Sequence, residues 1–154
     1  MKPKNSPLQQ TQFVVLDSSI KLYVPDNASE IDLSKIPVTM DFDLLENENN
    51  DPHTLRIVLS ITGNESDQVP GYIFNLTVGG EYSLSNNIEP GSDEYKAYVK
   101  NSALACLINE SRVFLQTISS FLPFGSYIMP MVDLNDLLLQ KSNHIAHGQD
   151  GSRP

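Results

Sequence analysis

Two segments of the chain alternate apolar and polar residues with a period of two, and this alternation limits the fold more than any other feature. In VTMDFDLL, residues 38–45, the even positions are apolar and positions 39, 41 and 43 are polar. LRIVLSITG, residues 55–63, repeats the pattern with apolar odd positions from 55 to 61. Because successive side chains of a strand point to opposite faces, both segments are predicted strands with one apolar and one polar face. The apolar face must be covered by another element.

Two further segments complete the predicted sheet. FVVLDSSIKLYV, residues 13–24, is rich in β-branched and aromatic residues and predicts a long strand, bent or bulged at residues 17–19. YIFNLTVGGEYSL, residues 72–84, predicts a fourth strand in which Gly79 and Gly80 indicate a bulge or kink. The polar crossing at residues 25–37 is long for a hairpin, so the first two strands need not be neighbours.

A helical periodicity follows the strands. Ser92 is a predicted N-cap, and acidic residues directly after it suit the positive end of a helix. Apolar residues then recur at three- and four-residue steps from 104 to 118, which places them on one helix face. Residues 121–132 are too rich in proline and glycine for a helix, and Asp133 or Asn135 can cap a short leucine-rich helix. The predicted fold class is α+β, with a four-stranded antiparallel sheet covered on one face by a long helix plus a short C-terminal helix.

The length of 154 residues indicates one domain. Because both ends are polar and aperiodic, we expect a flexible arm at residues 1–11, a folded domain at 12–141 and a disordered tail at 142–154. The N-terminus lacks the apolar stretch of a signal peptide, and no run approaches about 18 apolar residues. The single cysteine, Cys106, excludes an intrachain disulfide. These features predict a soluble, cytoplasmic protein.

The charges and the reactive residues argue against several function classes. The formal net charge is -9 and the basic residues are scattered, so we expect neither a nucleic-acid partner nor membrane insertion. His53 lies beside a predicted turn, and His144 and His147 lie in the predicted tail, where no pocket orients them as bases or ligands. Cys106 has no neighbouring base or cation in the sequence. The sequence therefore predicts no enzyme activity, no metal and no other cofactor.

Two features remain as candidate sites. Asp41 and Asp43 lie about 7 Å apart on one strand face, a spacing that suits paired carboxylates, but a solvated outer face is the favoured interpretation. The apolar loop at residues 121–132 contains Met129 and Met131, whose side chains adapt to differently shaped partners. Binding of apolar partners and ordinary burial in a core or an oligomer are both open interpretations of this loop.

Three motifs occur in a characteristic order and spacing. They are VTMDFDLL at residues 38–45, LTVGGEYSL at 76–84 and PMVDLNDLL at 130–138. Together with the order of strands and helices, they resemble the SecB family of protein-export chaperones over residues 12–141. The resemblance implies a homotetramer, built as a dimer of dimers, that binds unfolded polypeptide along apolar grooves without ATP.

The resemblance also assigns residues to a client-binding groove and to an oligomer interface. The groove takes apolar residues from the crossing, the apolar loop and the short helix: Ile31, Leu33, Ile36, Phe121, Leu122, Phe124, Tyr127, Met129, Leu134, Leu137 and Leu138. The interface takes residues from the first strand and the long helix: Val15, Leu104, Leu107, Ser111, Phe114 and Ile118.

One departure from the family pattern affects the expected partners. Ser19, Tyr23 and Asn75 stand where the family has the acidic residues that dock on the translocation ATPase SecA. Losing these carboxylates removes the charge complementarity that such docking uses. The clients implied by the resemblance are secretory precursors in protein export, or one dedicated partner such as an antitoxin in a toxin-antitoxin system. The missing acids favour the dedicated partner and count against SecA.

The sequence thus predicts an ATP-independent holdase that keeps non-native polypeptide soluble. The alternatives are a carrier of small apolar ligands and a non-chaperone oligomeric scaffold. A carrier would need a few polar groups converging on an apolar cavity, and the inward strand positions offer none.

Overall fold

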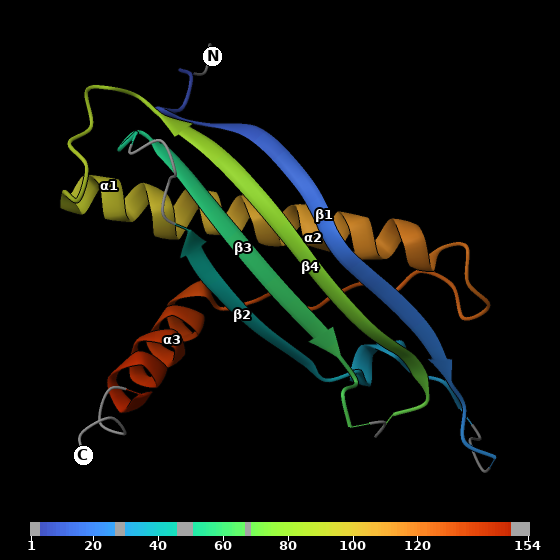
Figure 1. Ribbon diagram of the computed structural model, residues 1–154. Helices are drawn as coiled ribbons and strands as arrows, with labels where there is room; N and C mark the ends of the chain where they lie inside the picture. The colour runs from blue at the N-terminus through green and yellow to red at the C-terminus, as the bar shows by residue number, and fades with distance from the viewer. Residues whose placement is uncertain (1–3, 27–29, 46–50, 67–68, 149–154) are drawn as a thin grey trace.

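The computed structural model describes residues 4–26, 30–45, 51–66 and 69–148. A four-stranded antiparallel sheet lies across a long helix, and a second helix projects from one side (Figure 1). The elements are β1 (Leu8–Tyr23), the 3-10 turn η1 (Leu33–Lys35), β2 (Val38–Leu45), β3 (Thr54–Gly63), β4 (Gly71–Leu84), α1 (Asp93–Tyr98), the π-helical segment η2 (Val99–Ala103), α2 (Leu104–Ser119) and α3 (Leu134–Gly148). The predicted α+β class and the arrangement of sheet and helices are confirmed.

The strand order is β1-β4-β3-β2, and all neighbouring pairs are antiparallel. β2, β3 and β4 follow one another as a meander, whereas β1 pairs with β4 at the opposite edge from β2. The chain between β1 and β2 must therefore pass from one edge of the sheet to the other. A two- to five-residue hairpin cannot span that distance, which explains the length of the crossing at residues 25–37.

The inner face of the sheet, defined as the face that α2 covers, forms the core. The four alternating apolar residues of β3 from Leu55 to Ile61 are buried, and those of β4 from Tyr72 to Val78 are buried beside them. Leu104, Leu107 and other apolar residues of α2 pack against these two strands. The intervening strand residues face outward and include many polar side chains. The sheet is thus apolar on one face, as the period-two pattern predicted.

Two bulges in β1 bring apolar residues from both odd and even positions to the inner face. The register with β4 shifts between Gln10 and Gln12 and again between Val15 and Asp17. Each extra residue reverses the alternation, because strand side chains repeat with a period of two. Phe13 and Ile20, an odd and an even position, therefore both pack against the core. The bulge expected at residues 17–19 occurs at the position just before them.

The bulge predicted at Gly79 and Gly80 is wrong, because both glycines pair in continuous register with β1 and β3. Both glycines leave space for side chains of neighbouring elements, because they have no Cβ atom. A Cβ atom on Gly80 would lie 2.8 Å from the Tyr82 ring and 3.1 Å from Leu107 of α2. The missing side chain therefore lets α2 and the Tyr82 ring approach the sheet closely.

The long helix begins where the sequence predicted. Ser92 accepts a hydrogen bond from the backbone N–H of Tyr95 at 3.1 Å, as an N-cap does. The π-helical segment η2 joins α1 directly to α2, so the helical segment is continuous from Asp93 to Ser119. The inward face of α2 is the one that the three- and four-residue spacing predicted.

The structure departs from the expected domain boundaries at both ends. β1 begins at Leu8, which pairs with Leu84, and the neighbouring Pro7 carbonyl accepts a hydrogen bond from Ser85 N at 2.9 Å. α3 (Leu134–Gly148) continues through residues 142–148, which contain no proline. Residues 1–3 and 149–154 lie outside the described part of the chain.

Gly63 gives a test of how tightly the inner face is packed. A Cβ atom there would overlap the Phe74 ring, which also packs on the Tyr127 ring with centroids 5.1 Å apart. Gly63→Ala should lower the free energy of unfolding by about 1–3 kcal/mol, because the aromatic pair must move. Urea denaturation at fixed protein concentration measures the effect.

Gly79→Ala is the matched control, since this glycine faces outward and its nearest side-chain atom, Val14 Cγ2, would lie 3.1 Å from the new Cβ. We expect a change within about 0.5 kcal/mol. Equal losses of stability in the two variants would contradict the packing described for Phe74.

Candidate functional site

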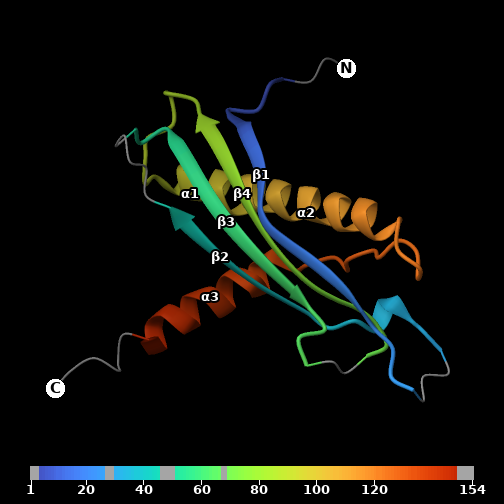
Figure 2. The ribbon, with the colours of Figure 1, turned by 45° about the vertical axis from the view of Figure 1, so that its right-hand side comes forward.

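The segment that connects α2 to α3, residues 120–133 and called the linker below, is the candidate site. It has no helical or strand structure over most of its length. The linker turns back after α2 and runs on the helix-covered side of the sheet to the start of α3 (Figures 1 and 2). Tyr127 and Met129 from the linker belong to the same buried core as the inner strand residues. The linker is therefore part of the folded domain.

Two hydroxyl groups fix the first half of the linker. The Tyr72 hydroxyl donates to the Gly125 carbonyl at 2.9 Å and accepts from the Phe124 backbone N–H at 3.1 Å. The Tyr72 and Phe124 rings pack with centroids 5.6 Å apart, and burial raises the pKa of Tyr72. Ser119, fully buried at the end of α2, accepts from Tyr127 N through its Oγ at 2.7 Å. The turn after α2 is thus held by both the sheet and the helix.

Arg112 of α2 fixes the second half. Its Nε donates to the Met129 carbonyl at 3.1 Å, and one terminal nitrogen lies 2.7 Å from the Met131 sulfur. Because the guanidinium spans a backbone and a side-chain group of the linker, it holds this stretch alongside α2. The middle of the linker therefore has one orientation relative to the helix.

This anchoring divides the apolar residues of the linker into two sets. Tyr127 and Met129 are completely buried, whereas Ile128 is 65% exposed and Met131 is 79% exposed. Phe121, at the beginning of the linker, is 84% exposed. The side chains of Ile128, Met131 and Phe121, called the exposed row below, are apolar and adaptable groups on a fixed backbone. Such a row can bury apolar side chains of another polypeptide.

The crossing between β1 and β2 meets the linker turn at the start of β4. A Cβ atom on Gly71 would lie 3.1 Å from Leu33 and 3.2 Å from Ile36, so the crossing packs directly over this glycine. The next residue, Tyr72, binds the linker turn. β4 therefore brings together two segments that are far apart in the sequence, as the resemblance implied for a common groove.

α3 is tied to β2. Leu134, Leu137 and Leu138 are half-buried and pack against the core, and the helix also contacts η2. Lys141 Nζ lies 2.8 Å from Asp41 Oδ1 and 2.9 Å from Asp43 Oδ1. The hydrogen bonds from Asp41 and then from Asp43 raise the pKa of Lys141. The two carboxylates, which the sequence placed on a solvated face, thus hold a lysine from another element.

The predicted groove residues fall into three classes. Ile36, Tyr127 and Met129 are buried in the core, so their assignment to an accessible groove is wrong, because no surface of these side chains is available. A second class is half-buried: Ile31, Leu33, Leu122, Phe124, Leu134, Leu137 and Leu138. Phe121 is exposed. Met131, which the sequence indicated only as part of the apolar loop, is exposed, as are Ile128 and Leu139, which it did not indicate; alternation along the linker could have indicated Ile128.

The predicted oligomer interface is wrong at Leu104, Leu107 and Ser111. These residues are fully buried against the sheet of their own chain, so no part of them can reach a second chain. Phe114 and Ile118 are half-buried, and Val15 on β1 is partly exposed. Homotetramer formation stays a prediction.

The outer face of the sheet carries the positions compared with SecA-docking acids. Ser19 and Asn75 are direct cross-strand partners on β1 and β4, and Tyr23 lies four residues beyond Ser19 on the same strand. The structure thus brings two of the three positions together. Absence of SecA binding stays a prediction, as does absence of enzyme activity.

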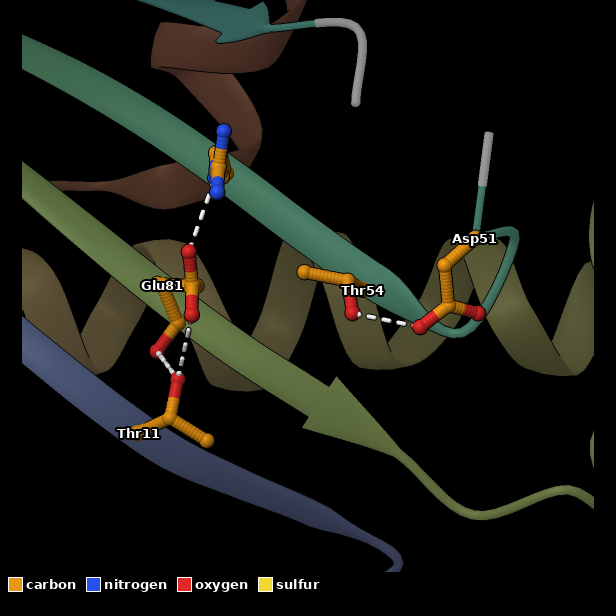
Figure 3. A network of polar contacts seen from close by, with 5 residues as sticks. Thr11, Asp51, Thr54 and Glu81 are labelled. Carbon is orange, nitrogen blue, oxygen red and sulfur yellow. Dashed lines mark hydrogen bonds and ion pairs between the residues drawn. The ribbon is translucent and has the colours of Figure 1, made fainter. Parts of the chain in front are cut away.

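The outer face also holds a network of polar contacts that crosses three strands (Figure 3). Arg56 Nε donates to Glu81 Oε2 at 2.8 Å, and Thr11 Oγ1 donates to the Glu81 carbonyl and Oε1, each at 3.1 Å. The hydrogen bond from Arg56, followed by that from Thr11, lowers the pKa of Glu81. A carboxylate held in its charged form by a guanidinium is a poor proton acceptor at neutral pH.

Within the described residues, no group of three or more His, Cys, Asp or Glu side chains lies close enough to hold a metal ion. Over the same part of the chain, no helix is long and apolar enough to cross a membrane.

Comparisons with known proteins identify a fold. No protein-family model matches the chain. No curated protein matches it either. The structure is similar to that of the SecB-like chaperone Rv1957 of Mycobacterium tuberculosis, which was solved in complex with a ChAD peptide from the HigA1 antitoxin Rv1956. The TM-score is 0.54 and the sequence identity 8%, over 82% of this chain and 91% of that one. A protein of unknown function from Streptococcus agalactiae is similar at a TM-score of 0.48 and 11% identity, over 81% of this chain and 97% of that one. The mycobacterial likeness shows that the chain has a SecB-like fold.

Two tyrosines test how the linker is anchored. Tyr72→Phe removes the hydroxyl that binds Gly125 and Phe124, and we expect a loss of about 1–3 kcal/mol of stability, because two backbone groups lose their partner.

Tyr127→Phe is the matched control. The Tyr127 hydroxyl is buried without a hydrogen-bond partner among the described residues, and burial raises its pKa to about 12. This change should be neutral or slightly stabilising. Chemical denaturation compares both variants, and a larger loss in Tyr127→Phe would contradict the anchoring.

Proposed function

We propose that this protein is an ATP-independent chaperone that binds non-native polypeptide and keeps it soluble. The observation that carries the proposal is the exposed row on the linker, displayed on a SecB-like fold. Three large apolar side chains exposed on one anchored segment are available to bury apolar side chains of a client.

The physical properties of the exposed row suit apolar segments of an unstructured client. Phe121 offers a large contact area, and the Met131 side chain is 79% exposed while its sulfur contacts Arg112. Tyr72, Ser119 and Arg112 fix the linker backbone, so a client does not have to order it on binding. A preformed apolar surface reduces the entropic cost of association. This combination favours binding of unstructured chains without a chemical energy source.

The client is proposed to be a dedicated partner, with an antitoxin as the favoured kind. The mycobacterial chaperone of similar fold binds an antitoxin peptide. In addition, Ser19, Tyr23 and Asn75 provide no carboxylate for an electrostatic SecA interaction. Secretory precursors are the other client class. We further propose a cytoplasmic location and a homotetramer, which light scattering on a size-exclusion column checks.

Aggregation of a chemically denatured model substrate tests the chaperone activity. We expect the purified protein to suppress light scattering at stoichiometric amounts and without ATP, because the exposed row binds apolar segments that would otherwise associate. Bovine serum albumin at equal mass is the control for non-specific crowding. Aggregation that proceeds unchanged at a twofold excess would overturn the proposal.

A double variant tests the surface. Ile128→Ser with Met131→Ser removes two exposed apolar side chains, and burial of one such side chain contributes about 1.5–3 kcal/mol. Affinity for an unfolded fluorescent client should fall about tenfold or more.

Leu16→Ser is the matched control, because Leu16 is also exposed but lines a shallow hollow on the outer face with Val14, Val58 and Gly79. Its affinity should equal that of the wild type. A similar loss of affinity in both variants would place client binding elsewhere, and urea denaturation checks that both variants fold.

A further inference from the structure

Lys141 occupies an unusual place on α3. Leu137, Leu138 and Lys141 lie three, four and seven residues after Leu134, so the lysine shares the inward face of the helix with the leucines. Its side chain is only 23% exposed, whereas a lysine on a helix surface normally reaches into water. A charge on the apolar face indicates a specific partner.

That partner is the pair of carboxylates on β2. Lys141 Nζ lies within 2.9 Å of both Asp41 Oδ1 and Asp43 Oδ1, and 5.7 Å from the centroid of the Phe42 ring between them. Asp41 and Asp43 belong to the outer face of the edge strand β2, while Phe42 belongs to the core. Lys141 of α3 therefore contacts two outer-face residues of β2, Asp41 and Asp43, and one core residue, Phe42.

The remaining attachment of α3 is modest. Its leucines at 134, 137 and 138 are half-buried, and Leu139 is 60% exposed. Other polar contacts of described α3 residues are local. The backbone N–H groups of Asn135 and Asp136 donate to Asp133 Oδ1, and Gln140 Nε2 donates to Asp136 Oδ2. The helix diverges from the sheet toward its C-terminal end (Figures 1 and 2). Lys141 is thus the polar link that holds an otherwise weakly packed helix.

We propose that Lys141, Asp41 and Asp43 form an electrostatic latch that keeps α3 closed on β2, and that release of the latch uncovers apolar surface for the client. The second part rests on the proposed function, and the first part does not. The two carboxylates are about two-thirds exposed, so water and salt compete with the lysine. The latch is therefore weak enough to open reversibly.

Release uncovers apolar groups on both elements. The inward face of α3 carries the three half-buried leucines, and Phe42 lies under the lysine. These groups belong to the element that directly follows the linker in the chain, so their release adds apolar surface to that of the exposed row. Client affinity is thereby linked to the opening of the helix.

Hydrogen exchange measured by mass spectrometry tests the latch itself. Lys141→Met keeps an unbranched side chain but removes the charge, and Lys141→Glu places like charges together. Loss of two exposed ion pairs should increase the open population about three- to tenfold, with faster exchange over residues 134–148 and 38–45. Raising the salt concentration should speed exchange in the wild type and have little effect on Lys141→Met.

Lys96→Met is the matched control, because Lys96 forms an exposed ion pair with Asp93 on α1, at 3.6 Å. It makes the same charge change without touching α3. Combining Lys141→Glu with Asp41→Lys and Asp43→Lys reverses both partners and should restore slow exchange. Unchanged exchange in both single Lys141 variants, or equal acceleration in Lys96→Met, would overturn the latch.

Client affinity tests the coupling. Lys141→Met should bind an unfolded client about three- to tenfold more tightly than the wild type, since less of the protein is closed. If Lys141→Met shows faster hydrogen exchange but unchanged client affinity, the latch stands and its coupling to client binding is overturned. A wild-type protein that binds no client while Lys141→Met exchanges faster would refute the proposed function alone.

Discussion

The contact between α2 and the inner face of the sheet is the interaction on which the rest of the structure depends. Gly80 leaves the space into which the Tyr82 ring and Leu107 fit, so the helix approaches β4 closely. The helix then buries its own leucines and the alternating residues of β3 and β4 together. Because α2 covers only part of the inner face, the linker completes the core with Tyr127 and Met129. The fold therefore uses as core a segment whose proline and glycine content is typical of a surface loop.

This double use of the linker gives it two sets of side chains with different roles. The buried set and the hydrogen bonds from Tyr72, Ser119 and Arg112 fix the backbone. The same backbone displays Ile128 and Met131 to the outside. A loop of equal composition without these anchors would collapse onto its own apolar residues. In the proposed chaperone function, this anchoring keeps Ile128 and Met131 exposed for a client, and the proposed latch controls how much of the inward face of α3 is covered.

The local elements could largely be predicted, because strand and helix periodicities are written directly in the chain. The alternation in residues 38–45 and 55–63, the Ser92 cap and the helix face from 104 to 118 all agree with the structure. The errors concern how elements meet. Gly79 and Gly80 were read as a bulge, whereas they accommodate neighbouring side chains, and the bulges lie on the partner strand. The resemblance places Leu104 and Leu107 in an oligomer interface, whereas they are buried against the sheet of their own chain, and apolar periodicity alone does not say which surface covers a helix face.

The sequence by itself determined the α+β class, the four strands with one polar face and the long amphipathic helix. These properties follow from residue spacing over short distances. Only the tertiary structure decided the strand order that sends the crossing from edge to edge, the burial of Tyr127 and Met129 beside the exposed Ile128, and the meeting of Lys141 with Asp41 and Asp43. The reason is that these features depend on contacts between residues as much as 100 positions apart, and local patterns carry no information about which distant surfaces meet.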